Sequence, residues 1–303
     1  MKKLLLLLPL VLQIFLVTPT PNEALSLSNR CQVEDRTTCL SIEILAITKQ
    51  NPEQLIPLFT EFSTLLKNKT ITDDPRIFSP IVHEVGMELA FNKIPPAEAF
   101  ELCPLNFKAG CLHGVVMEYL DELPTVDFAF CDFAESNPTY YSNCIHGIGH
   151  VLAAKTTGDL NETLPLCTLT DSALNHACVT GVFMEFSTGV HGTGHHTHEP
   201  PVGSILLPCA EVDAPYQSSC YPSMSSYHQY LPTTEPFTET AQSCLAAPTE
   251  FQNACLLGLA EKILTSTAQD TNKSHTMCET LNSTQIESCK DSVDHIDELE
   301  SVL

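Results

Sequence analysis

The 303-residue sequence has no tryptophan and few basic side chains. Its 14 lysines and arginines stand against 37 aspartates and glutamates, which gives a formal net charge of -23. This excess of acid would repel the phosphates of nucleic acids and the headgroups of anionic membranes, so it argues against proteins that bind either polyanion. Disorder is also disfavoured, because 43% of the residues are hydrophobic and can form a packed core.

Several motifs of known chemistry are missing as well. There is no His-Glu-x-x-His, no Cys-x-x-Cys-His, no glycine-rich phosphate loop and no Gly-x-Ser-x-Gly. These absences argue against a zincin protease, covalently attached haem, a nucleotide-binding loop and an α/β-hydrolase nucleophile. The sequence therefore indicates no particular reaction, and no catalytic residue is assigned.

The first residues have the pattern of a signal peptide, which we predict over residues 1–26. Lys2 and Lys3 precede an apolar stretch over residues 4–17, and small and polar residues follow. The stretch is shorter than the ~20 residues needed to cross a bilayer, and an uncleaved anchor is the alternative. We expect residues 27–303 to form a single domain in a secreted or periplasm-like extracytoplasmic location, without a transmembrane segment after cleavage. Acceptor triplets predict a glycoprotein where the host glycosylates: Asn68, Asn161, Asn272 and Asn282.

The 14 cysteines fall into seven sequential pairs, and none is lost with the signal peptide. From Cys111 onward, the second members recur at steps of 33, 34, 42, 35 and 34 residues, a period typical of two-helix repeats. We predict that each pair is a disulfide at the turn of a helical hairpin, because zinc-binding cysteines favour spacings of two to four residues. The pairs are Cys31 with Cys39, Cys103 with Cys111, Cys131 with Cys144, Cys167 with Cys178, Cys209 with Cys220, Cys244 with Cys255, and Cys278 with Cys289.

Together these patterns predict an all-α fold, a right-handed stack of disulfide-stapled helical hairpins with a period of about 34 residues. Asn or Ser residues able to cap a helix precede the second cysteines. We expect helix starts there, at Asn143, Asn175, Ser219, Asn253 and Ser288.

Aligned on the second cysteine, the repeats share two further columns. The positions two and six residues later lie one turn apart on one helix face. They are occupied by His83 and Met87, with Ile81 in the cysteine position, then His113 and Met117, His146 and His150, and Thr180 and Met184. A glycine lies three residues after the cysteine, where it lets a partner helix approach closely. Glu88, Glu118 and Glu185 follow their glycines by two to four residues, and loop capping or a catalytic base are both open for them.

Four ordered motifs between residues 75 and 190 carry a resemblance. They are His83-Glu-Val-Gly, Gly110-Cys-Leu-His-Gly-Val-Val-Met-Glu, Cys144-Ile-His-Gly-Ile-Gly-His and Cys178-Val-Thr-Gly-Val-Phe-Met-Glu. As a set, they resemble an uncharacterised group of secreted or membrane-attached, cysteine-rich microbial proteins. The resemblance implies that these positions matter and implies no activity. The Trp and Leu-Gly signature of tetratricopeptide repeats is absent.

We predict a metal site where the columns of neighbouring repeats meet, in residues 75–190. Equivalent helix faces in adjacent repeats lie ~8 to 10 Å apart, so their side chains can converge. The ligands would be His83, His113, His146 and His150, with Met87, Met117 and Met184 as thioethers. A mixed His/Met set favours copper, with zinc or iron possible if only imidazoles bind. The alternative is that these side chains pack between helices without metal.

A histidine-rich loop over residues 190–200 accounts for the longest repeat step. Its glycines, threonines and proline predict a loop, which either covers or loads the metal site or is only a solvated segment. The histidines are His191, His195, His196 and His198.

Two functions follow: an exported metal protein, either carrier or metalloenzyme, or an extracellular scaffold that binds a protein or glycan without metal. Metal in the native protein would separate them.

Overall fold

The computed structural model describes residues 36–51, 54, 57–58, 60–61, 64, 75–103, 108–121, 123–188, 190–191, 195–196, 206–226, 236–266, 271–279 and 286–294. Within these residues the fold is all-α, as predicted, apart from a hairpin of two short strands, β1 (Val190–His191) and β2 (His195–His196). None of the described helices is both long and apolar enough to cross a membrane. The following predicted features lie outside the described residues: the signal peptide, Cys31, Asn68, Asn282 and His198.

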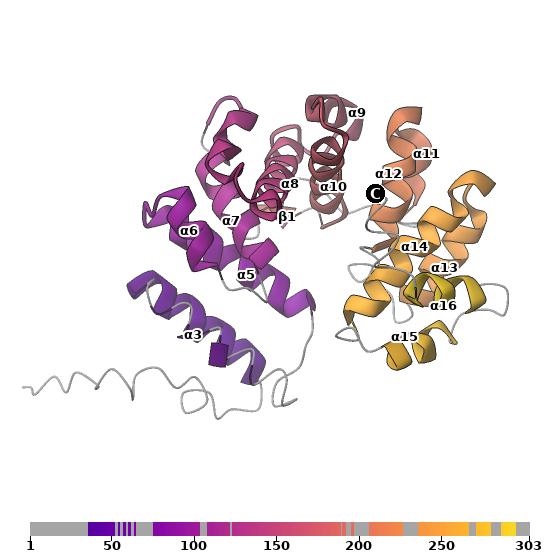
Figure 1. Cartoon of the computed structure of the whole chain (residues 1–303), viewed down its shortest axis with the longest axis horizontal. Helices are drawn as coiled ribbons and strands as arrows, with labels where there is room; N and C mark the ends of the chain where they lie inside the picture. The colour runs from indigo at the N-terminus through magenta and orange to yellow at the C-terminus, as the bar shows by residue number, and fades with distance from the viewer. Residues whose placement is uncertain are drawn as a thin grey trace, which may run out of the picture.

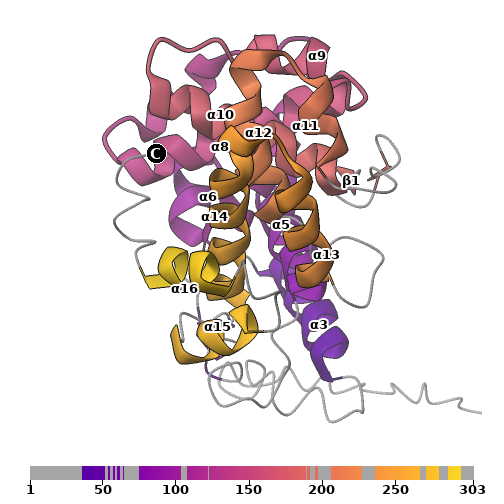
Figure 2. The same ribbon diagram turned by 90° about the vertical axis from the view of Figure 1, so that its right-hand side faces the viewer.

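The longer helices form an inner row, in which each helix packs against the next. In Figure 1 the row follows an arch that starts at the indigo end of the chain and finishes at the yellow end. Figure 2 shows the same stack from its side. The inner helices are α3 (Arg36–Gln50), α5 (Pro75–Phe91), α7 (Lys108–Asp121), α8 (Pro138–Lys155), α10 (Ser172–Thr188), α12 (Ala214–Ser226), α14 (Thr249–Ser266) and α16 (Ile286–Asp294).

Shorter elements form an outer row, and each packs on the inner helix that follows it. They are α6 (Pro96–Leu102), η3 (Phe128–Ala134), α9 (Leu160–Thr163), η4 (Leu164–Cys167), α11 (Leu207–Glu211), α13 (Pro236–Ala246) and α15 (Thr271–Cys278). In the six pairs that the structure describes in full, the first cysteine lies in or just after an outer element and the second lies in an inner helix. The core fills the seam between the rows, where the second cysteines of these six pairs are buried.

Six disulfides join the outer elements to the inner helices. Their Cα atoms are 5.5 to 5.8 Å apart, and the bonded cysteines are 8 to 13 residues apart in sequence. These bonds confirm six of the seven predicted pairs. They join Cys103 to Cys111, Cys131 to Cys144, Cys167 to Cys178, Cys209 to Cys220, Cys244 to Cys255, and Cys278 to Cys289. Cys39 is also disulfide-bonded.

The 34-residue period and the right-handed sense of the stack stay predictions. The cysteines of the later hairpins follow the same plan as those of the first half. Cys220 lies in α12 and Cys289 lies in α16, and both are buried at the seam between the rows. Every hairpin from α6 and α7 to α15 and α16 therefore carries its own crosslink.

The inner helices begin earlier than the sequence analysis expected. The Asn137 side chain caps α8 by accepting a hydrogen bond from the Tyr140 backbone N–H at 3.3 Å, with Pro138 at the first helical position. Asp171 caps α10 in the same way. Asn143, a predicted cap, lies within α8 instead. That prediction was wrong because proline and a preceding polar side chain define a helix start, and here they lie more than one turn before the cysteine.

The inner helices touch backbone to backbone in pairs. A Cβ atom on Gly149 of α8 would lie 2.1 Å from the Cys178 carbonyl oxygen of α10, and one on Gly181 of α10 would lie 2.0 Å from the His146 carbonyl oxygen of α8. Only glycine permits this approach, because any side chain would overlap the facing backbone. The column of glycines therefore brings neighbouring inner helices together rather than the two helices of one hairpin.

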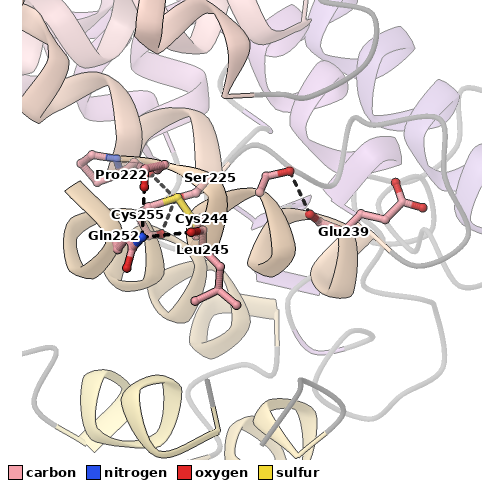
Figure 3. The surroundings of a disulfide bond; sticks show 9 residues. Pro222, Ser225, Glu239, Cys244, Leu245, Gln252 and Cys255 are labelled. Carbon is pink, nitrogen blue, oxygen red and sulfur yellow. Dashed lines mark hydrogen bonds between the residues drawn. A yellow bond between two sulfur atoms is a disulfide. The ribbon is translucent and has the colours of Figure 1, made fainter. Parts of the chain in front are cut away.

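The same crossing recurs on both sides of this pair. Gly114 of α7 meets the His83 carbonyl oxygen of α5 in the way that Gly181 meets that of His146. In the third pair, Gly258 of α14 meets the Pro222 carbonyl oxygen of α12, and Ser225 donates a hydrogen bond to the Cys255 carbonyl oxygen at 2.7 Å. Figure 3 shows Ser225 at this crossing beside the disulfide of Cys244 and Cys255. Close contacts thus occur between α5 and α7, α8 and α10, and α12 and α14, so two hairpins form one packing unit.

Gly149→Ala should destabilise the protein by about 1 to 3 kcal/mol, the usual cost of overpacking. The added methyl group would meet backbone atoms of α10, which cannot rotate away. Gly110→Ala is the matched control, because its methyl group would meet side-chain atoms of Val82 and His83 at 3.2 Å or more and gains the same helix propensity. Thermal and urea unfolding measure both. An equal effect of the two substitutions would contradict the close helix contact.

Candidate metal centre

The two glycine-mediated helix pairs each place a histidine at their crossing point. His83 of α5 faces Gly114 of α7, and His146 of α8 faces Gly181 of α10 through their carbonyl oxygens. Helices α7 and α8 pack on each other between the pairs. His113, the residue before Gly114, and His150, one turn after His146, are therefore brought to the same place as His83 and His146.

Three of these histidines form a compact set. His83, His113 and His150 each offer one ring nitrogen, and the three nitrogens lie within 4.8 Å of one another. The ring centroids of His113 and His150 are 5.3 Å apart, and His83 lies 5.6 Å from the former and 5.9 Å from the latter. Zn–N bonds of ~2.0 to 2.1 Å place ligand nitrogens at most about 4.2 Å apart, so small rotations of the rings would suffice to bind one ion.

A carboxylate fixes the orientation of His150. The Nδ1 atom of His150 lies 3.0 Å from Oε2 of Glu185, and both side chains are buried. A carboxylate only accepts, so Nδ1–H of His150 donates and Nε2 keeps its lone pair. This His–carboxylate contact is the usual support for a metal-binding histidine. The contact with His150 is a third role for Glu185, different from the loop capping and the catalytic base considered from the sequence.

His146 is held in a similar tautomer by Thr180. The Thr180 hydroxyl donates to the Ala177 carbonyl oxygen at 2.9 Å, so it accepts from Nδ1 of His146, 3.1 Å away. Nε2 of His146 is therefore the nitrogen with a lone pair. The His146 ring stacks on that of His113, with centroids 4.4 Å apart. His146 thus adjoins the three-histidine set as a fourth imidazole.

The cluster holds buried nitrogens without hydrogen bonds. Among the described side chains, this applies to both ring nitrogens of His113 and to Nε2 of His146 and of His150. His113 and His150 are 5% and 3% exposed, respectively. Each buried polar group left without a partner costs about 1 to 3 kcal/mol. A metal ion held by one nitrogen each of His83, His113 and His150 would give two of these buried nitrogens a partner.

Burial keeps His113 and His146 neutral, which is the form that binds metal. The pKa of His113 is well below its ordinary value of 6.5, chiefly because of burial and then because of the neighbouring histidines. Burial also lowers the pKa of His146 well below 6.5, with further contributions from His150, His83 and His176. Four histidines this close could not all carry a charge.

A cavity of about 630 Å³ opens beside the cluster. The histidines His83, His113 and His146 form one side, and Glu261 and Lys262 of α14 contribute to its wall. The other lining residues are Ala109, Gly110, Ser142, Asn143, Ala173, His176, Ala177, Thr180 and Met184. The volume is that of a small-molecule site, so the cluster is accessible to an ion or a small substrate.

The three predicted thioether ligands lie in different surroundings. Met184 lines the cavity beside the histidines. Met117 is buried in the core with 2% exposure, one turn after His113. Met87 lines a separate cavity of about 450 Å³ together with Lys49, Glu84, Glu88, Phe91, Asn92 and Glu118. Among the described histidines, cysteines and carboxylates, the one set of three ligand atoms within 4.8 Å of one another contains only imidazoles.

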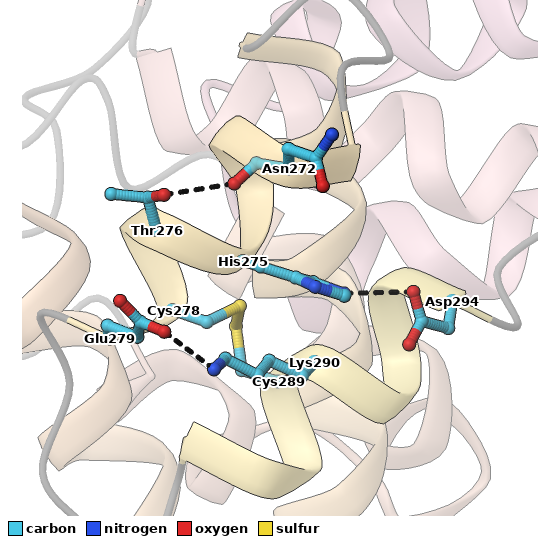
Figure 4. A network of polar contacts seen from close by, with 8 residues as sticks. All are labelled: Asn272, His275, Thr276, Cys278, Glu279, Cys289, Lys290 and Asp294. Carbon is cyan, nitrogen blue, oxygen red and sulfur yellow. Dashed lines mark hydrogen bonds and ion pairs between the residues drawn. A yellow bond between two sulfur atoms is a disulfide. The ribbon is translucent and has the colours of Figure 1, made fainter.

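Of the four loop histidines, the structure describes only the backbone of His191, His195 and His196. His191 pairs with His195 in the β1–β2 hairpin, whose first strand contacts α8 and α10. His275, which the sequence analysis did not select, bonds to Asp294 at 2.8 Å in the last hairpin, as Figure 4 shows. His176 was also passed over, although it lines the cavity. Its position on the cavity-facing side of α10, four residues before Thr180, is the pattern that would have identified it.

Comparisons of the sequence with models of known families and with curated proteins, and of the fold with solved structures, find no match. The resemblance noted in the four motifs therefore stays a prediction. The function has to be argued from the geometry of the site.

The metal-free protein should lose stability as the pH falls through about 6.5, where histidines of the unfolded chain take up protons. The pKa values of His113 and His146 are lowered in the folded chain, so below this pH the unfolded state binds more protons and the free energy of unfolding falls. Melting midpoints measured in the presence of a chelator between about pH 7.5 and pH 5 give the slope of stability against pH. His113→Asn should reduce the slope, and the exposed-site variant Thr276→Ala should leave it unchanged; equal slopes in all three proteins would contradict this prediction.

Proposed function

We propose that the protein binds a transition-metal ion with His83, His113 and His150, and that His146 is the fourth imidazole available to it. The observation that carries the proposal is the convergence of three ring nitrogens from α5, α7 and α8 within 4.8 Å. Two of the three rings are almost completely buried, and Glu185 holds one in the tautomer that a metal requires. Histidines that only pack between helices need neither feature.

Copper and zinc are the metals that this set favours. Neutral imidazoles suit both ions and also iron. The Met184 thioether lies on the cavity wall outside this set, where a soft ligand favours the approach of Cu(I). The absence of thiolates from the set agrees with the disulfide bonding of the described cysteines.

The cavity supports a metalloenzyme or a carrier that exchanges its ion, rather than a purely structural centre. Structural zinc sites are closed by four protein ligands, whereas catalytic sites use three and leave a position for water or substrate. Here three imidazoles form the set, and two of them border a cavity of about 630 Å³. A bound ion would supply Lewis acidity or an activated water at this position.

We also propose that the protein works outside the cytoplasm. Six described disulfides are typical of chains that fold in an oxidising compartment. The signal-peptide pattern over residues 1–26 supports export, and the four acceptor triplets are compatible with glycosylation. Under these conditions thiols are unavailable, and histidine is the natural choice for a borderline metal.

Elemental analysis of the protein made through an oxidising export route tests the metal site. The parent protein should contain about one ion per chain, because the converging imidazoles form a single set. His113→Ala should contain almost no metal, because it removes the central ligand. His275→Ala is the matched control, since His275 lies in the last hairpin and bonds to Asp294. Circular dichroism should show unchanged helicity in both variants.

A parent protein without metal, which also binds none on titration, would refute the proposal. That result would favour the alternative of an extracellular scaffold for a protein or glycan. Equal metal content in His113→Ala and the parent would place the ion elsewhere.

Glu185→Gln should weaken metal binding by about 10- to 100-fold, the usual effect of losing the partner of a ligating histidine. The amide has the same shape as the carboxylate, but it no longer carries the charge that strengthens the His150 ligand. Glu118→Gln is the matched control, because Glu118 occupies the corresponding place after the α7 glycine and lines the other cavity. Competition with a chelator measures both affinities. Equal affinities for the two variants would show that the Glu185 contact does not support a ligand.

A further inference from the structure

One face of α10 runs along the cavity as a ladder of potential ligands. His176, Thr180 and Met184 are spaced four residues apart, and all three line the cavity. Residues at this spacing lie above one another on a helix surface. Thr180 in the middle contacts His146. The ladder therefore borders the histidine cluster on one side of the cavity.

This cavity borders part of the buried set. His83 and His113 line it, whereas His150 does not and is backed by Glu185. The backbones of α5 and α7 touch at Gly114, and those of α8 and α10 touch at Gly181. An ion inside the cavity therefore meets the side chains of α10 as well as the imidazoles of His83 and His113.

The two ends of the ladder have the chemistry to hold an ion in transit. Nδ1 of His176 lies 3.4 Å from the Ser219 hydroxyl. The other ring nitrogen, Nε2, can therefore act as the ligand atom. His176 is near enough to His146 to affect its charge, and burial lowers the pKa of His176 below 6.5. Met184 adds a thioether, and Glu261 adds a carboxylate to the same wall. A chain with a net charge of -23 attracts cations into such a space.

We infer that His176 and Met184 each offer a transfer site on α10, where an incoming copper or zinc ion binds before it passes to His83, His113 and His150. This inference rests on the proposed function and adds the route by which the site is filled. The transfer exchanges coordinate bonds only: the ion gives up water for His176 or Met184, and then exchanges these ligands for imidazoles of the buried set. No electron is transferred, and each lone pair returns to its own side chain.

The ligand chemistry predicts different effects for the two residues. Imidazole binds both Zn²⁺ and Cu⁺, whereas a thioether binds Cu⁺ much better than Zn²⁺. His176→Ala should therefore slow uptake of both ions, and Met184→Leu should slow uptake of Cu⁺ alone. Each affected rate should fall by about tenfold or more, which corresponds to a barrier raised by about 1.4 kcal/mol. Stoichiometry at equilibrium should not change, because neither residue belongs to the final set.

Stopped-flow mixing of the full-length, metal-free protein with Zn²⁺, or with Cu⁺ held by a weak chelator, measures these rates. His275→Ala and Met277→Leu are the matched controls, since both residues lie on α15 in the last hairpin. These two variants should take up metal at the rate of the parent protein. Circular dichroism verifies that each variant folds.

Unchanged uptake rates in both His176→Ala and Met184→Leu, with the parent still binding metal, would overturn the transfer site and leave the proposed function intact. Loss of equilibrium binding in either variant would also overturn it, because that residue would then be a permanent ligand. A parent that binds no metal would instead refute the proposed function itself.

Discussion

Backbone contact between helices is the constraint from which the rest of this structure follows. Gly114 and Gly181 let α7 and α10 approach the carbonyl oxygens of His83 and His146 to a distance that no side chain would allow. The contact fixes the rotation of each helix about its axis as well as its position. Because a histidine stands at each of the two contacts, the rotation that closes the helices also points imidazoles into the space between them.

The spacing of residues along the chain predicted what single hairpins contain, and the structure supplied how hairpins meet. Cysteine pairing and the column of histidines follow from sequence distances within one repeat. The pairing of α5 with α7 and of α8 with α10 does not, because it depends on which glycines face each other. For the same reason the contact between His150 and Glu185, which are 35 residues apart, could not be inferred, and His176 was not selected as a site residue. The helix starts were misplaced because a cap was sought beside each cysteine.

The third helix pair shows that the fold and the site are separable. Helices α12 and α14 cross in the same manner, with Gly258 against the Pro222 carbonyl oxygen. Proline and leucine stand there in the places of the histidines, and Ser225 bridges the crossing through a hydrogen bond. The helix crossing therefore forms either with histidines or with proline and leucine at these positions. Histidines at the first two crossings are not needed to build it, which agrees with a functional reason for four imidazoles whose burial is costly.

The disulfides have a consequence for what happens when the chain is cut. Each of the six closes a loop of neighbouring sequence, with its cysteines no more than 13 residues apart, so none of them ties one hairpin to another. A protease that cleaves between two of these hairpins would leave every one of the six disulfides intact, and none of the six would join the two fragments. Each fragment would keep its own staples, and only side-chain and backbone packing would hold the arch together. In an environment rich in proteases, the weak points of this molecule are therefore its connections rather than its hairpins.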